Sequence, residues 1–313
     1  MALIDFLLMS TFDFNPTNHV FAYKKVVNKI YPVSTTMSEY AKVRCQFPED
    51  PLKTLPDVPL HPLDFTPGTR LTKKRLDELG VIEDDFLWLE ERKIVAVVLK
   101  NNEMGLAWNE SEKGRFRDDY FTPVIMTVVD HIPWVKQSLL IPPGICDKII
   151  ALIKQKIAAG VYEPSNSSYH HQWFCVVKKN SDICIVHNLG LLNAIMIKDA
   201  AQPPLVEHYA EQCSARSIYT SLDLFVRYDH RTQAPKSHDL TAFDPPLETH
   251  WLTVLPQGWH GSLAVFHPDV AFILQHETGI TLNFSNNISV LGPRTCYEMV
   301  DGNYKVMEGN TGV

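Results

Sequence analysis

The side chains best suited to chemistry in this sequence stand at the ends of two predicted strands. Asp223 lies near the end of an alternating run, Ser217–Leu224, and a carboxylate at a strand end is exposed to a cleft. The tetrad Phe284–Asn287 lies in a predicted hairpin, and its last two residues, Asn286 and Asn287, are neutral amides. A single Asp after a strand is also typical of a turn, so Asp223 by itself leaves both interpretations open.

Histidines beside acids suggest hydrolysis as an alternative chemistry. The sequence has 13 histidines. The most suggestive groupings are His170-His171, Asp229-His230 and His267-x-Asp269. However, the sequence lacks an H-E-x-x-H zinc motif, a G-x-S-x-G nucleophile elbow and a phosphate-binding P-loop. Scattered histidines are typically surface or core residues, and Asp118-Asp119 is typical of a solvated loop or a helix start.

Composition indicates an ordinary globular protein. The 313 residues are 45% hydrophobic and 21% charged, which fits one large domain or two smaller ones. The six cysteines form no C-x-x-C pair and are typical of reduced intracellular thiols. The apolar opening Met1–Met9 has no basic region and carries Asp5, and no run reaches the roughly 18 apolar residues of a membrane span. We therefore expect an intracellular protein, cytoplasmic or nuclear, without a signal peptide or a transmembrane segment.

The net charge of −7 is unfavourable for binding nucleic acid, but the charge is uneven. Between Trp134 and Asn180 six lysines face only Asp147 and Glu163, whereas the chain after Pro204 is mostly acidic. A basic lobe beside an acidic one suits a protein that grips phosphates on one side. Solvated helix faces would give the same pattern, so both interpretations stay open.

Periodicity and the placement of Pro and Gly predict the elements. Six prolines between Pro48 and Pro67 exclude long helices, so we expect an extended or loosely ordered arm there. The predicted helices are Lys73–Leu79, capped by Thr72, then Asp84–Trp108, a helix within 142–160, Leu205–Cys213 and Gly261–Gln275. The predicted strands are the hairpin of Trp173–Lys179 with Ile183–Val186, then Ser217–Leu224, a pair within 241–254, and the hairpin around Phe284–Asn287.

Six short motifs follow one another in a specific order and spacing. They are residues 157–168, 173–179, 192–199, 219–224, 240–243 and 255–259, the last reading Leu-Pro-Gln-Gly-Trp. From about Trp134 onward the chain thereby resembles the reverse transcriptase of gypsy-type LTR retrotransposons. Residues 24–122 look like the polyprotein region just upstream of the polymerase in such elements.

The resemblance implies an α+β fold of reverse-transcriptase-like fingers and palm, in which an antiparallel palm sheet is packed on one face by helices and carries the catalytic positions at its centre. We expect a proline-rich, partly irregular arm at 1–70, a helical extension at 71–130, a fingers-like region at 131–215 and a partial palm at 216–313. The chain ends about 25 residues after the tetrad, so we expect no thumb. Without a thumb, the protein would bind a template-primer duplex weakly.

The resemblance also implies which residues would act. Members of the family join a primer 3′ hydroxyl to a dNTP with two Mg²⁺ ions, which clamp the attacking and leaving oxygens. The metal ligands would be Asp223 and the tetrad positions Asn286 and Asn287. The dNTP would meet Lys178 and Lys179 on the fingers hairpin, Tyr228 under the sugar, and Gln257. An RNA or DNA template-primer would be the partner.

The departures from the family pattern predict a defect. In the family the tetrad ends in two aspartates, whereas Asn286 and Asn287 bring no charge. Since opposite unit charges at 4 Å interact by about 4 kcal/mol at an effective dielectric near 20, we expect Mg²⁺ binding to be weak or absent. Cys184, Asn188, Arg227 and Glu248 stand where Arg, Asp, a small residue and Gly are usual. Several of these replacements are single G:C to A:T transitions, so a decayed element copy is our hypothesis.

We therefore expect a truncated, degenerate reverse-transcriptase-like protein of retrotransposon origin that is catalytically defective. The alternative is a binding module that keeps the same fold to hold nucleic acid or protein without catalysis. A salt-sensitive affinity for RNA would favour the alternative.

Overall fold

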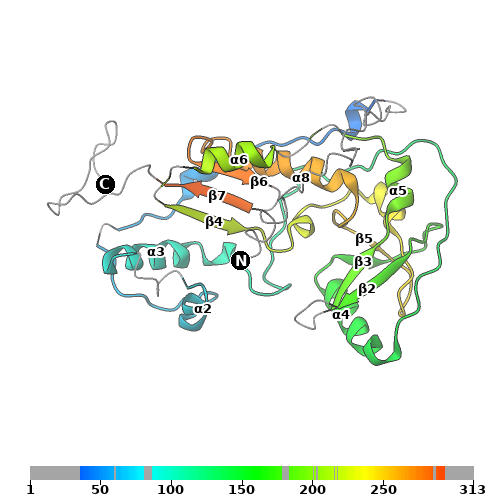
Figure 1. Ribbon diagram of the computed structural model, residues 1–313, viewed down its shortest axis with the longest axis horizontal. Helices are drawn as coiled ribbons and strands as arrows, with labels where there is room; N and C mark the ends of the chain where they lie inside the picture. The colour runs from blue at the N-terminus through cyan, green and yellow to red at the C-terminus, as the bar shows by residue number, and fades with distance from the viewer. Residues whose placement is uncertain are drawn as a thin grey trace, which may run out of the picture. The chain divides into compact units, whose positions relative to one another are not determined.

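The computed structural model of this protein describes residues 36–59, 61–80, 87–177, 183–199, 201, 204–214, 216, 218–284 and 287–292 (Figure 1). The chain divides into two compact units, Met1–Thr36 and Met37–Val313, and all of the first except Thr36 lies outside the described residues. The second unit combines helices with short antiparallel strands, which confirms the predicted mixed α+β class.

The first elements of the second unit are short helices. They are the 3₁₀ helices η2 (Glu39–Ala41) and η3 (Pro51–Thr54), the α-helices α2 (Lys73–Glu78) and α3 (Leu89–Asn101), and the 3₁₀ turn η4 (Glu103–Gly105). Thr72 caps α2 as predicted, because its side chain accepts the Arg75 N–H. Gly80, just beyond this helix, has the positive φ of 66° that glycine adopts without strain.

The helix predicted over Asp84–Trp108 is shorter than expected. Its first three residues lie outside the described part, and α3 ends at Asn101 because Asn102 leaves helical geometry. The next residue, Glu103, turns its carboxylate toward the backbone N–H groups of residues 69–71. Helices α2 and α3 share a small core of their own, in which Leu71, Leu76 and Ala96 are buried.

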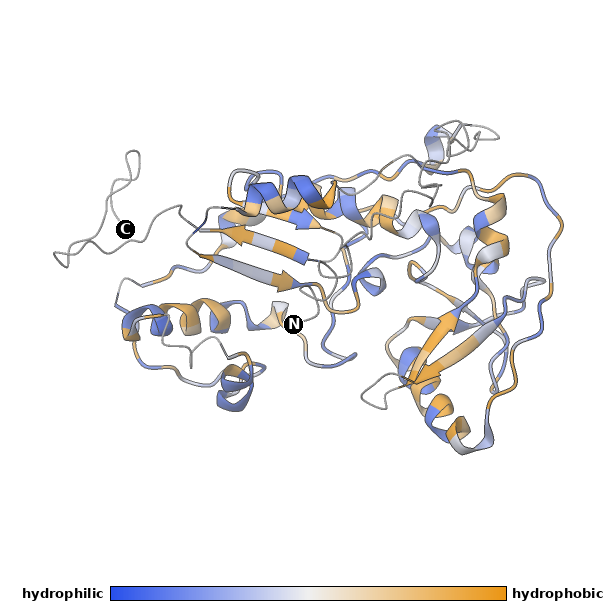
Figure 2. Cartoon of the chain, viewed as in Figure 1, coloured by the Kyte–Doolittle hydropathy of each residue, from blue (hydrophilic) through white to orange (hydrophobic). Residues whose placement is uncertain are grey.

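The described middle part of the chain forms a 3₁₀ turn, three α-helices and three strands that belong to two two-stranded sheets. These elements are η5 (Pro143–Ile145), α4 (Cys146–Ala158), β1 (Tyr162–Pro164), β2 (Trp173–Val177), β3 (Ile183–His187), α5 (Gly190–Ile195) and α6 (Val206–Cys213). The predicted hairpin is confirmed: β2 and β3 pair antiparallel, with Trp173 opposite His187. Figure 2 shows both strands as hydrophobic along much of their length, and Trp173 lies in a core with Ile149 and Ile153 of α4.

The strand pair expected within 241–254 is not formed as predicted. Only β5 (His250–Leu252) is a strand there, and it pairs antiparallel with β1. Phe243 and His250 make a single bridge across the Pro245-Pro246 turn. Proline cannot donate to a ladder, which explains why the pairing stops after one bridge.

The last elements build a three-stranded sheet against a long helix. They are β4 (Tyr219–Asp223), η6 (Arg227–His230), α7 (Pro235–His238), η7 (Asp239–Thr241), α8 (His260–Ile273), β6 (Thr281–Phe284) and β7 (Asn287–Leu291). The strand order is β4-β7-β6, all antiparallel, so β4 lies at an edge of this sheet. The expectation that Asp223 stands at the centre of the sheet is therefore wrong, because β7 takes the middle place.

Helices contact this sheet on both faces, not on one as expected. The Tyr209 hydroxyl of α6 lies 2.6 Å from Ser289 Oγ on β7, and Figure 1 shows α6 lying over the strands. Asn283 on β6 donates to His267 of α8. Because Ser289 pairs with Leu282 and side chains alternate along a strand, Asn283 and Ser289 lie on opposite faces.

The largest core joins this sheet and α8 to the segments that precede them. Phe266, Leu255 and Val270 are almost completely buried in it, and Ile288 of β7 packs against it. None of the helices in the described part of the chain is long and apolar enough to cross a membrane.

Candidate functional site

Two of the three predicted catalytic positions meet at one end of the three-stranded sheet. Asp223 is the last residue of β4 and pairs in register with Asn287, the first residue of β7. Directly paired residues share a face of a sheet, and both of these are exposed. The structure therefore brings Asp223 and Asn287 together, whereas Asn286 lies outside the described residues.

The donor set at this strand end does not fit a pair of magnesium ions. Such ions need several hard oxygen ligands, usually carboxylates. Here one carboxylate, that of Asp223, faces the neutral amide of Asn287. Among the described residues no group of three His, Cys, Asp or Glu is arranged to hold a metal ion.

Two of the predicted nucleotide contacts share a cavity of about 440 Å³. Tyr228 and Gln257 both line it, together with Arg227 and Asp199. The predicted lysine contacts, Lys178 and Lys179, lie outside the described residues. A cavity of this size, with several polar groups at its wall, suits a small ligand.

The loop that carries Gln257 is held by Asn193, a residue that the sequence analysis did not single out. The Asn193 side chain of α5 donates to the Gly258 carbonyl and accepts the His260 N–H, each at 2.9 Å. Gly258 has φ +100°, and a Cβ there would lie 3.4 Å from the His187 carbonyl, so glycine is required for its backbone conformation. Asn193 lies inside the 192–199 motif, and that position was the available signal for its role.

Tyr228 is mainly a core residue. Its ring is 9% exposed and meets Phe266 edge-on, with the ring centroids 5.7 Å apart. Burial raises the pKa of its hydroxyl. The guanidinium carbon of Arg227 lies 4.4 Å from the centroid of the same ring. Trp259 and Phe266 are buried as well.

A cluster of four charges holds the turn that carries Tyr228. Lys113 and Lys156 donate to Asp229 at 2.5 and 3.1 Å, and both also donate to Glu110. Burial acts to raise the pKa of Glu110, but hydrogen bonds from the two lysines hold it below its ordinary value. The charge of Lys156, one of the six lysines of the predicted basic lobe, is therefore balanced by Asp229 and Glu110 inside the protein.

The histidine groupings do not form a hydrolytic site in the described residues. Both ring nitrogens of His171 face backbone carbonyls, and burial lowers its pKa. His230 bonds the Phe225 carbonyl, and burial lowers its pKa too. Asp269 is paired with Arg231 rather than with His267. Through these contacts His171, His230 and Asp269 stabilise the fold.

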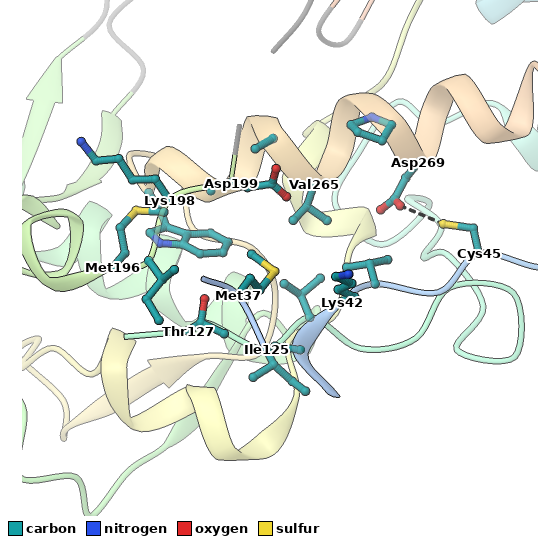
Figure 3. Close-up of a pocket in the computed structure, with 18 residues that line it drawn as sticks. Met37, Lys42, Cys45, Ile125, Thr127, Met196, Lys198, Asp199, Val265 and Asp269 are labelled. Atoms are coloured by element: carbon teal, nitrogen blue, oxygen red, sulfur yellow. Dashed lines mark hydrogen bonds between the residues drawn. The ribbon is translucent and has the colours of Figure 1, made fainter. Parts of the chain in front are cut away.

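A second cavity, of about 460 Å³, lies beside the first and shares Asp199, Trp259 and Ala264 with it. Figure 3 shows Cys45 pointing toward Asp269 at one end, where the thiol donates to the carboxylate at 3.3 Å. Burial, together with the nearby Asp269 charge, raises the pKa of Cys45 to about 12. The thiol is therefore protonated near neutral pH and is a weak nucleophile.

Known proteins give a fold match but no sequence match. No protein-family model and no curated protein sequence matches this chain. Among solved structures, a foamy viral protease-reverse transcriptase in complex with double-stranded DNA superposes with a TM-score of 0.65 at 20% identity, over 74% of this chain and 40% of that one.

Two further solved structures agree. A foamy viral protease-reverse transcriptase with an RNA/DNA hybrid and a mutant of the prototype foamy virus enzyme both give a TM-score of 0.61, at 19% and 21% identity. Each is covered over 30% of its length by 74% of this chain, so the chain spans well under half of these proteins. The likeness shows that this chain has a fold found in foamy virus protease-reverse transcriptase.

Proposed function

We propose that this chain is a reverse-transcriptase-like protein, derived from a gypsy-type retrotransposon, whose polymerase site is defective. The observation that carries the proposal is the pairing of Asp223 with Asn287 at one strand end. In an active site of this kind acids would stand at both places to hold metal ions. A single carboxylate beside an amide cannot supply the charge that a two-metal phosphoryl transfer needs.

The arrangement of the remaining parts supports the same assignment. We assign the β2–β3 hairpin with α4 to fingers, and the β4-β7-β6 sheet with α8 to palm. The cavity shared by Tyr228 and Gln257 is the proposed place of the dNTP, and Lys178 and Lys179 stay predicted contacts of its phosphates. The solved foamy virus structures hold double-stranded DNA and an RNA/DNA hybrid, which supports a nucleic-acid duplex as the partner class.

Primer extension tests the catalytic part of the proposal. The unmodified chain and the double variant Asn286→Asp/Asn287→Asp are compared on an RNA template with Mg²⁺ or Mn²⁺. We expect no extension by the unmodified chain and measurable extension by the double variant, because restored carboxylates can bind the metals. The same double variant carrying Asp223→Asn is the control and should lose the recovered activity. Extension by the unmodified chain would contradict the proposed defect.

A binding module is the second candidate function. The solved complexes with nucleic acid favour it, because a fold can keep its duplex-binding surface after its catalytic acids are lost. Fluorescence anisotropy with a labelled RNA/DNA hybrid tests this function. Binding that weakens steeply between 50 and 200 mM salt, as expected for contacts to phosphates, supports it. Binding that does not respond to salt contradicts it.

A further inference from the structure

Arg227 occupies an unusual place in the turn between β4 and the core. The residue before it, Val226, has φ 49° and ψ 50°, a left-handed conformation that is rare for a β-branched side chain. This reversal directs the chain so that Arg227 and Tyr228, although adjacent, both line the cavity that also contains Gln257. The turn therefore sets the position of the guanidinium as well as that of the ring.

The guanidinium covers the ring of Tyr228. Its central carbon lies 4.4 Å from the ring centroid, which is within the range of a favourable cation–π contact. Phe266 meets the same ring from the core, edge-on at 5.7 Å. With the core on one side and the guanidinium on another, little of Tyr228 remains accessible from the cavity.

The turn has little freedom to move this arginine away. Asp229 donates its backbone N–H to the Val226 carbonyl at 2.9 Å, and its carboxylate accepts hydrogen bonds from Lys113 and Lys156. Arg231, two residues farther on, is fully buried and paired with Asp269 at 2.6 Å. The base of the turn is therefore fixed, and relief requires a new rotamer of the Arg227 side chain.

We propose that Arg227 closes the Tyr228 side of the nucleotide cavity of this chain, as a second obstacle to polymerisation independent of the tetrad. The proposal rests on the proposed function, which assigns this cavity to the dNTP. A nucleotide whose sugar packs against Tyr228 must first displace the guanidinium from that ring, so ground-state binding is weakened. A change of this kind raises the KM for the nucleotide more than it lowers kcat.

Steady-state primer extension in the Asn286→Asp/Asn287→Asp background tests the role of Arg227. We expect Arg227→Ala to lower the KM for dNTP by about tenfold or more while kcat changes by less than about threefold. The matched control is Arg117→Ala, since the Arg117 guanidinium also stacks on a tyrosine, 4.7 Å from the Tyr120 ring, but does not line the cavity. An unchanged KM for Arg227→Ala, or an equal fall for Arg117→Ala, would overturn the proposal.

A binding measurement separates this inference from the proposed function. A fluorescent dATP analogue is titrated, without metal, into the unmodified chain and its Arg227→Ala variant in the presence of template-primer. Tighter binding by Arg227→Ala supports the closed cavity even where no variant extends a primer, and that result would overturn only the polymerase assignment. Equal binding by both chains, with extension recovered in the tetrad variant, overturns the role of Arg227 and leaves the proposed function intact.

Discussion

Two regions of this molecule carry charge in opposite ways. In the interior, Arg231 is paired with Asp269, and two lysines are paired with Asp229 and Glu110. At the end of the three-stranded sheet, exposed Asp223 stands opposite the neutral Asn287. Each of these interior charges faces an opposite charge, whereas at the strand end an acid stands opposite an amide. The comparison indicates that the molecule pairs opposite charges inside its fold and sets an acid opposite an amide at the strand end to which we assign the chemistry.

We expect the largest effect from a variant that breaks the interior ion pair between Arg231 and Asp269. Arg231→Met leaves the Asp269 carboxylate buried without its cation, so we expect a loss of about 3–5 kcal/mol in the free energy of unfolding. Urea denaturation followed by circular dichroism measures the change. The exposed pair Arg117–Asp119 has the same chemistry and the same 2.6 Å separation, and Arg117→Met should cost less than about 1 kcal/mol.

The double variant Arg231→Met/Asp269→Leu sharpens this test. Burial raises the pKa of Asp269 although Arg231 acts to lower it, so desolvation outweighs the attraction of the pair. Replacing both partners by apolar side chains removes the unpaired charge but leaves the Phe121 and Thr122 carbonyls without their Arg231 donors, so the double variant should recover part of the stability that the single variant loses. A double variant as unstable as Arg231→Met would contradict this account.

The four-charge cluster should give the next largest effect. Asp229→Asn keeps the shape of the side chain but leaves Lys113 and Lys156 with only Glu110 as an acidic partner. We expect a loss of about 1–3 kcal/mol in urea denaturation, because buried donors lose a charged acceptor. Glu49→Gln, at an exposed position outside the cluster, is the control and should change stability by less than about 0.5 kcal/mol. Equal effects of the two variants would contradict a structural role for the cluster.

The sequence predicts the local elements well and the long-range ones poorly, for a physical reason. Thr72 and Gly80 delimit α2 because capping and positive φ act within a few residues. The edge position of β4 depends on which strand it pairs with, about 70 residues farther along the chain. The contact of Lys113 with Asp229 likewise spans 116 residues. No local pattern specifies such contacts, and the resemblance to a family suggested only that Asp223 meets Asn287 and that Tyr228 and Gln257 lie near one another.

Glu103 provides a third kind of charge environment, in which backbone N–H groups donate hydrogen bonds to a carboxylate. Acid titration tests its contribution to stability. Hydrogen bonds from the Leu71 and Arg70 N–H groups, with others from Thr69, lower the pKa of Glu103 to about 2. Because the folded pKa is below the ordinary value of 4.5, this stabilisation is present above about pH 4.5 and is lost as the pH falls toward 2. Glu103→Gln should therefore lower the thermal midpoint at pH 7 and remove part of the decline between pH 4.5 and 2. A variant that declines as steeply as the unmodified chain would contradict this assignment.

A smaller effect is expected from the strained turn. Val226→Gly should stabilise the protein by up to about 1 kcal/mol, since a left-handed conformation costs a β-branched residue about 1–2 kcal/mol and glycine loses part of this gain to chain entropy. Val176 is similarly exposed but lies in the regular strand β2, so Val176→Gly should destabilise. If Val226→Gly is as destabilising as Val176→Gly, the turn carries no strain.

The smallest expected effect is at the strand end. Asp223→Asn keeps the shape of an exposed side chain at a strand end, so the free energy of unfolding should change by less than about 0.5 kcal/mol. In the Asn286→Asp/Asn287→Asp background the same substitution should abolish primer extension, because the restored aspartates need Asp223 to complete the metal ligands. A residue that matters little for folding but decides activity is what the comparison of the two regions predicts for this position. Should Asp223→Asn instead unfold the protein as readily as Asp229→Asn does, the strand end would have to be counted among the structural charges, and the contrast between the two regions would no longer hold.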